Sequence, residues 1–67
     1  MPLIQVTMLK GRTPEQKQAL MRELTQAAVS TINANPESIR VVLYEVDGDH
    51  FAVAGETMTE RKAAAAK

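Results

Sequence analysis

The chain opens with a short apolar run, residues 2–9, whose length and β-branched side chains are typical of a β-strand. Within this run Ile4, Val6 and Met8 are spaced by two, so they share one face of the strand with Pro2. The polar residues 10–12 break the pattern. We therefore expect a first strand that ends just before them.

A helical pattern follows and predicts a helix from residue 14 to about residue 32 or 33. Thr13 can cap this helix, Pro14 suits its first position, and Gln16 completes a capping box. The predicted buried stripe consists of Leu20, Leu24, Ala27, Ala28 and Thr31, widened by Met21 and Ile32. The asparagines and proline of residues 33–36 predict the end of the helix.

Residues 39–46 form a second, almost continuously apolar run, which is typical of a strand covered on both faces. Strand, helix and strand in this order predict a βαβ unit with parallel strands. Residues 47–49 predict a turn, and residues 50–55 a short hairpin. From about residue 59 the alanine-rich tail has no apolar stripe, so we expect it to be frayed. The prediction is one α+β domain over residues 1–67.

The size of the chain predicts an oligomer. It has 67 residues, 45% of them hydrophobic, and no cysteine that could cross-link a small core. A two-stranded βαβ unit is too small to be stable alone. We expect a partner chain to extend the sheet and to cover its open face.

Charge and composition argue against several classes of protein. Lysine plus arginine equals aspartate plus glutamate, at eight each, so a nucleic-acid or anionic-membrane partner is not expected. No apolar run is long enough to span a membrane. The absence of cysteine and of an export signal suits the cytoplasm. His50 is the single histidine, so we predict no metal site.

Pro2 is the first candidate for chemistry, because it directly follows Met1. If Met1 is removed, the Pro2 nitrogen is a secondary amine with a basic lone pair. If Met1 stays, that nitrogen is a tertiary amide and cannot act as a base. The alternative interpretation is that Pro2 only begins an edge strand, where proline is tolerated.

Arg12 and Arg40 are the next candidates, since a guanidinium binds a carboxylate through two parallel hydrogen bonds. Parallel strands bring Arg40 to the same end of the sheet as Pro2, and the even numbering of both is compatible with a shared face. Arg12 follows the far end of the first strand, on the order of 20 Å away at strand rise. It can act with Pro2 only from a neighbouring subunit or through a folded-back loop. The alternative is that both arginines are ordinary surface residues.

Five short motifs, at residues 2–6, 9–12, 15–17, 38–41 and 48–56, together resemble the 4-oxalocrotonate tautomerases. The resemblance runs from Pro2 to about Glu56 without an evident gap. It implies a βαβ unit with a small hairpin, assembled as a homohexamer that is a trimer of dimers. It also implies an isomerase that works without a cofactor.

The resemblance assigns a role to each matching residue. Pro2 is the general base, and Arg12 engages the 2-keto or enol oxygen and a nearby carboxylate oxygen. Arg40, from a neighbouring subunit, binds the far carboxylate, while Phe51 and Leu9 keep the pocket apolar. The implied substrate is a small unsaturated 2-hydroxy or 2-keto acid such as 2-hydroxymuconate. An apolar wall and nearby arginines disfavour a charged amine, so they would lower the pKa of Pro2 towards the working pH.

Two alternatives remain at this point. One is a tautomerase for another small enol, such as phenylenolpyruvate. The other is a catalytically silent oligomeric module that retains Met1. Hydration and dehalogenation, found in some relatives, need a carboxylate that positions water, and neither Leu9 nor the apolar residues 51–53 supply one.

Overall fold

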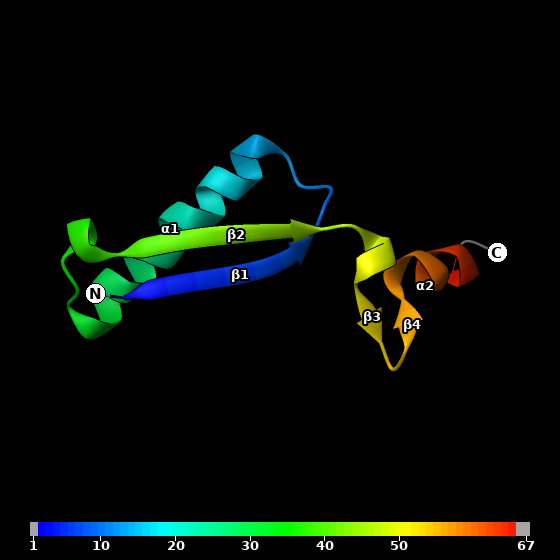
Figure 1. The fold of residues 1–67 in the computed structure, drawn as a ribbon. Helices are drawn as coiled ribbons and strands as arrows, with labels where there is room; N and C mark the ends of the chain where they lie inside the picture. Colours follow the sequence, from blue (N-terminus) through cyan, green and yellow to red (C-terminus); the bar gives the residue numbers. More distant parts are fainter. Residues whose placement is uncertain (1, 66–67) are drawn as a thin grey trace.

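The computed structural model describes residues 2–65 and has the predicted α+β fold (Figure 1). Its regular elements are β1 (Leu3–Leu9), α1 (Pro14–Ile32), β2 (Arg40–Val46), β3 (Ala52–Val53), β4 (Glu56–Thr57) and α2 (Met58–Ala65). Single 3₁₀ turns at Pro36–Ser38 and Gly48–His50 precede β2 and β3. The predicted βαβ unit and the short hairpin after it are both confirmed, and the hairpin strands lie two residues later than expected.

Strands β1 and β2 pair in parallel, as predicted, with Leu3 opposite Arg40 and Leu9 opposite Val46. The ladder extends at both ends, because Arg40 N–H donates to the Pro2 carbonyl and Lys10 N–H donates to the Val46 carbonyl, each at 3.0 Å. The two strands therefore form a straight ribbon whose ends are well defined.

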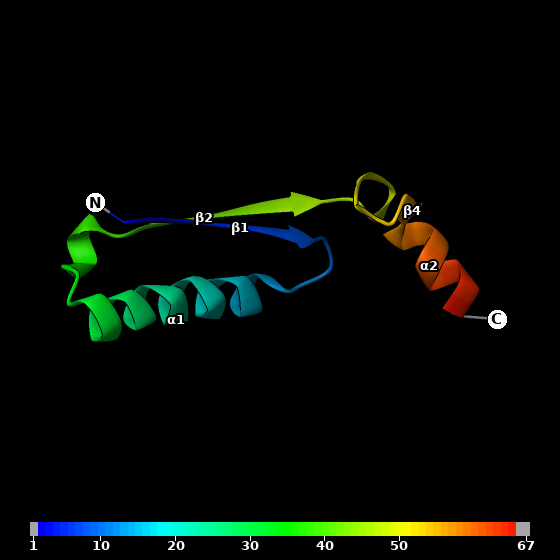
Figure 2. The same cartoon turned by 90° about the horizontal axis from the view of Figure 1, so that it is seen from below.

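Helix α1 lies along one face of this ribbon and leaves the other face open (Figure 2). On the covered face Ile4, Val6 and Met8 are half-buried, as predicted from their spacing. On the helix, the predicted stripe residues Leu20 and Leu24 are half-buried too.

At the C-terminal half of α1 the predicted stripe was wrong for three residues. Ala27 and Thr31 are exposed, and Ile32 is 64% exposed, whereas Ala28 is half-buried as predicted. The buried face is turned towards the side that carries Lys17, whose Nζ contacts Glu45 Oε1 on β2 at 3.0 Å. This ion pair holds the lysine against the sheet.

The open face of the sheet shows that one chain cannot complete its own core. Leu3 is 53% and Tyr44 49% exposed on this face, and among residues 2–65 Ile39 is the single buried hydrophobic residue. The accessible surface of 5187 Å² exceeds the roughly 4200 Å² typical of a compact monomer of this mass. The radius of gyration is 15.5 Å, against about 11 Å for a compact chain of this length.

The ends of α1 are closed as the sequence predicts. Thr13 Oγ1 accepts the Gln16 N–H at 3.1 Å, and Gln16 Oε1 accepts the Thr13 N–H at 3.0 Å. Asn33 adopts the left-handed conformation, with φ of 56°, just after the last turn. No helix within residues 2–65 is long and apolar enough to cross a membrane.

The tail differs from the expectation that it is frayed from about residue 59. Residues 58–65 form α2, and residues 66–67 lie outside the described part of the chain. A second capping box starts this helix: Thr57 Oγ1 accepts the Glu60 N–H at 3.1 Å, and Glu60 Oε1 accepts the Thr57 N–H at 2.9 Å. The Thr57 N–H, and next the Thr57 hydroxyl, which donates to the same Glu60 Oε1 at 2.9 Å, lower the pKa of Glu60.

The hairpin turn carries a strained residue. Ala54 and Gly55 connect β3 to β4 with φ values of 54° and 82°, as a two-residue hairpin turn requires. Glycine tolerates this conformation, whereas for alanine it costs on the order of 1 kcal/mol.

We therefore expect Ala54→Gly to stabilise the hairpin, by up to about 1 kcal/mol after the larger chain entropy of glycine is subtracted. Hydrogen exchange of the hairpin amides, read by NMR, measures the effect as slower exchange. The matched control is Ala52→Gly, at an extended strand position, which should speed exchange because no strain is relieved there. Faster exchange in Ala54→Gly would show that Ala54 is not strained.

Candidate functional site

Pro2 and Arg40 lie at the same end of the sheet, as predicted from parallel pairing. The Arg40 N–H donates to the Pro2 carbonyl at 3.0 Å. The predicted shared face is wrong, however, because the register places Arg40 opposite Leu3 rather than opposite an even-numbered residue. Side chains alternate along a strand, so Arg40 points to the open face and Pro2, in phase with Ile4, to the helix face.

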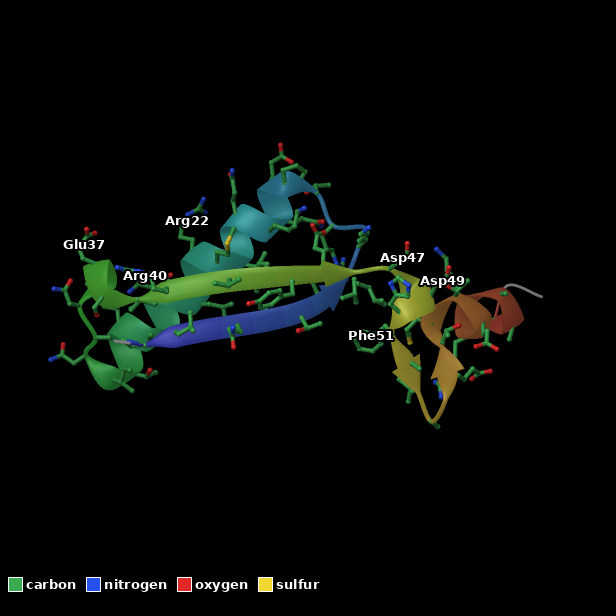
Figure 3. The ribbon with its side chains drawn as sticks, viewed as in Figure 1. Arg22, Glu37, Arg40, Asp47, Asp49 and Phe51 are labelled. Atoms are coloured by element: carbon green, nitrogen blue, oxygen red, sulfur yellow. The ribbon has the colours of Figure 1, made fainter. Side chains whose placement is uncertain are left out.

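The Arg40 guanidinium is oriented by backbone carbonyl groups. Its Nη1 donates to the Glu37 carbonyl at 2.8 Å and to the Ile39 carbonyl at 3.4 Å. The 3₁₀ turn that presents Glu37 is itself capped by Asn35, whose Oδ1 accepts the Glu37 N–H at 3.0 Å. Figure 3 shows Arg40 beside Glu37, at the end of the sheet opposite Phe51. The turn thus places an exposed cation at the start of the open face.

The other three predicted residues, Leu9, Arg12 and Phe51, meet at the opposite end of the sheet. They line one hollow of about 560 Å³, which we call the front hollow. Its lining residues come from the end of β1, from the loop after it and from residues 51–65, which contain β3, β4 and α2 and which we call the arm. They are Thr7, Met8, Leu9, Lys10, Gly11, Arg12, Phe51 and Met58. Gly11 has a φ of 131°, a conformation that suits glycine, and this turn directs Arg12 towards the hollow.

The predicted site is therefore split within one chain. Pro2 and Arg40 stand at one end of a seven-residue strand, and the front hollow lies at the other. At strand rise the two groups are on the order of 20 Å apart. A small substrate can contact both groups only where two copies of the chain place opposite ends of their sheets together.

Met58 also lines the front hollow, and the sequence interpretation missed it. Its N–H donates to the Phe51 carbonyl at 2.8 Å, so these two residues stand side by side on the arm. The signal was present, because Thr57 followed three residues later by Glu60 is a capping box and predicts a helix that starts at Met58. The expectation of a frayed tail hid it.

A second hollow, of about 490 Å³, lies behind Met58. We call it the back hollow. It is lined by residues of β1, of the turn before the arm and of α2: Leu9, Lys10, Asp47, Gly48, Met58, Thr59, Lys62 and Ala63. Leu9, Lys10 and Met58 belong to both hollows and so form the wall between them.

Two further polar residues, Glu45 and His50, lie outside the front hollow. Glu45 is paired with Lys17 on the helix face. His50 is exposed at the end of its 3₁₀ turn. Within residues 2–65 no three histidine, cysteine, aspartate or glutamate residues are grouped closely enough to hold a metal ion.

Comparison with known proteins identifies the family. The sequence profile of the family described as "Tautomerase enzyme" matches residues 2–61. The chain belongs to the tautomerase family. It is 43% identical to the 2-hydroxymuconate tautomerase of Bacillus subtilis over 60 residues, which cover 90% of this chain and 97% of that relative. This tautomerase is therefore an enzyme, an isomerase.

Solved structures extend the likeness to the whole fold of this tautomerase. A chain of the 4-oxalocrotonate tautomerase isozymes from Methylibium petroleiphilum superposes with a TM-score of 0.92 at 41% identity, covering 94% of this chain and 98% of that one. A heterohexamer 4-oxalocrotonate tautomerase from Chloroflexus aurantiacus gives 0.86 at 38% identity, with 90% and 97% coverage.

Proposed function

We propose that this tautomerase is a cofactor-independent isomerase that moves a proton within a small unsaturated 2-hydroxy or 2-keto acid such as 2-hydroxymuconate. The observation that carries the proposal is the placement of one arginine at each end of the sheet, with Pro2 beside one of them and an apolar hollow beside the other. A dicarboxylate has an anionic group at each end, which this arrangement matches. The names of the similar proteins support the same substrate class.

Pro2 is the proposed general base, once Met1 has been removed. A dienol loses a proton at oxygen and gains one at a distant carbon, and a single group can carry it both ways if its pKa lies near the working pH. A secondary amine in water is too basic for this. In the proposed assembly the arginines and the apolar wall of a neighbouring chain's hollow would disfavour the charged amine. Met1 itself lies outside the described residues.

Arg12, Leu9 and Phe51 are the proposed groups around the enol end of the substrate. Arg12 would donate hydrogen bonds to the enol oxygen and the adjacent carboxylate, where negative charge develops as the dienolate forms. Leu9 and Phe51 keep the surroundings apolar, which strengthens these hydrogen bonds. The three residues share one hollow, so one subunit supplies all of them.

Arg40 is the proposed partner of the far carboxylate, and the site is proposed to form between subunits of a homohexamer. The open sheet face and the separation of the two residue groups both support an assembly that joins opposite ends of neighbouring chains. A hexameric relative of the same fold makes this assembly size the natural proposal. Both arginines would then act on one substrate from different chains.

A second candidate substrate is an aryl enol such as phenylenolpyruvate. The side chains of Leu9, Phe51 and Met58 give the front hollow an apolar side that suits an aromatic ring. This substrate would use the same base and the same Arg12, without a far carboxylate for Arg40.

Removal of Met1 is the first condition of this mechanism. Protein from which Met1 has been removed should isomerise 2-hydroxymuconate, followed by ultraviolet absorbance, because the Pro2 amine is then basic. Protein carrying an additional residue before Pro2, verified by intact mass, should be near background. Equal activity in the two forms would remove Pro2 from the mechanism, whereas background activity in both would favour the silent-module alternative.

Substitutions of the two arginines should affect different steady-state constants. Arg12→Ala should lower kcat, because it removes a donor to charge that develops in the transition state, and Arg40→Ala should mainly raise KM for a diacid. Each effect should be about ten- to hundredfold, as for a charge-assisted hydrogen bond. Phenylenolpyruvate, a monoacid, should be less sensitive to Arg40→Ala than 2-hydroxymuconate. Unchanged kinetics in both variants would leave them as surface arginines.

Mixing inactive subunits tests whether the site is shared. Homomers of Pro2→Ala and of Arg12→Ala should each be impaired. Mixed assemblies, refolded together, should regain activity, because random pairing gives about a quarter of the sites an intact proline and an intact arginine from different chains. Pro2→Ala mixed with a Pro2→Ala, Arg12→Ala double variant is the matched control and should regain none. No recovery in the first mixture would place both residues in the same chain's site.

A further inference from the structure

Met58 occupies a place in the fold that gives it control over the size of the front hollow. It stands next to Phe51 and, together with Leu9 and Lys10, separates the front hollow from the back hollow. Of these three residues Met58 alone belongs to the arm, and it is half-buried. Met58 is therefore the residue of the arm that borders both hollows.

The backbone of Met58 is fixed from two sides. Its N–H donates to the Phe51 carbonyl at 2.8 Å, which continues the hairpin pairing of Ala52 with Thr57 by one residue. On its other side the capping box of Thr57 and Glu60 sets the first turn of α2. A change of side chain at Met58 therefore alters the wall without moving the residues that hold it.

The side chain of Met58 is suited to an adjustable wall. Methionine is unbranched and has a polarisable sulfur, so it adapts its shape to neighbours of different size. Next to it the back hollow offers about 490 Å³, and the small residue Ala63 is among its lining residues. A shorter residue at position 58 would join the two hollows into one space next to Arg12.

We infer that Met58 is a specificity-determining residue, which sets how large a substrate group the site accepts beside Arg12. The inference rests on the proposed function, since Arg12 is the residue proposed to hold the enol oxygen. In phenylenolpyruvate the ring is bonded to the carbon next to the enol carbon, so the ring would lie against this wall. In 2-hydroxymuconate the same carbon carries only a thin chain, which leaves the wall untouched.

The test compares two substrates in the assembled enzyme after removal of Met1. Met58→Ala should raise the ratio of kcat/KM for phenylenolpyruvate to that for 2-hydroxymuconate by at least about tenfold, as expected when several heavy atoms are removed from a pocket wall. Met58→Leu, which keeps the volume, should leave the ratio near that of the parent enzyme. Circular dichroism and native mass check that each variant has kept its fold and assembly.

A second substitution tests whether the extra room in Met58→Ala comes from the back hollow. If the ring gains room from the back hollow, Ala63→Leu added to Met58→Ala should fill that room and return the ratio towards the parent value. Ala64→Leu is the matched control, because both alanines are exposed positions of α2 and both substitutions preserve helix propensity. It should leave the gain of Met58→Ala intact.

The outcomes separate this inference from the proposed function. A folded, active Met58→Ala enzyme with an unchanged ratio overturns the role of Met58 while the isomerase stands. If the parent enzyme turns over neither substrate, calorimetric binding of phenylpyruvate and of muconate replaces the kinetic ratio. A tenfold shift in relative affinity in Met58→Ala then supports the inference without the proposed reaction. If the relative affinity for the two ligands is the same in Met58→Ala as in the parent enzyme, or if the parent enzyme binds neither ligand, the inference is overturned.

Discussion

The structure depends on one constraint, which is that the chain can cover only one face of its own sheet. A single amphipathic helix packs on the two-stranded ribbon, and the opposite face keeps Leu3 and Tyr44 about half exposed. The hydrophobic effect contributes about 25 cal/mol for each Å² of apolar surface removed from water, so this face is a large unused source of stability. Covering this face requires another chain, so a single chain does not complete its own hydrophobic core.

The parallel pairing of the two strands explains why the candidate site is divided. Arg12 follows the end of β1 and Phe51 follows the end of β2, so both lie far from Pro2, which precedes β1. Each chain carries Pro2 and Arg40 at one end of its sheet, and a hollow lined by Leu9, Arg12 and Phe51 at the other. The proposed assembly would serve two purposes, since it would cover the open face and bring unlike ends together. Stability and catalysis would then depend on the same contacts.

Local patterns were enough to predict much of the fold. The two strands, the helix and its caps follow from alternation, helical spacing and the capping box at Thr13 and Gln16. The placement of Pro2 and Arg40 at the same end of the sheet was also predictable, because parallel pairing requires it. These features depend on residues that are close in sequence or on a topological rule, and both are visible without coordinates.

Features that depend on register or on a distant partner were not predictable in this way. Residue parity placed Pro2 and Arg40 on one face, yet the pairing of Leu3 with Arg40 puts them on opposite faces, and no local signal sets that offset. The ion pair of Lys17 could not be predicted either, because its partner Glu45 comes 28 residues later. Met58 was missed for a different reason, since an alanine-rich tail concealed the capping box that precedes it.

Strand β1 also fixes a distance along the sheet, because a strand has a constant rise per residue. Its seven residues set the distance between Pro2 and the front hollow within one chain, and each added residue would lengthen it by about 3.3 Å. One added residue would also turn every following side chain to the other face, so the smallest step that keeps the faces is two residues, or roughly 6.6 Å. Side chains that line the hollow change in steps of one carbon atom, so they adjust the size of a site more finely than the strand can.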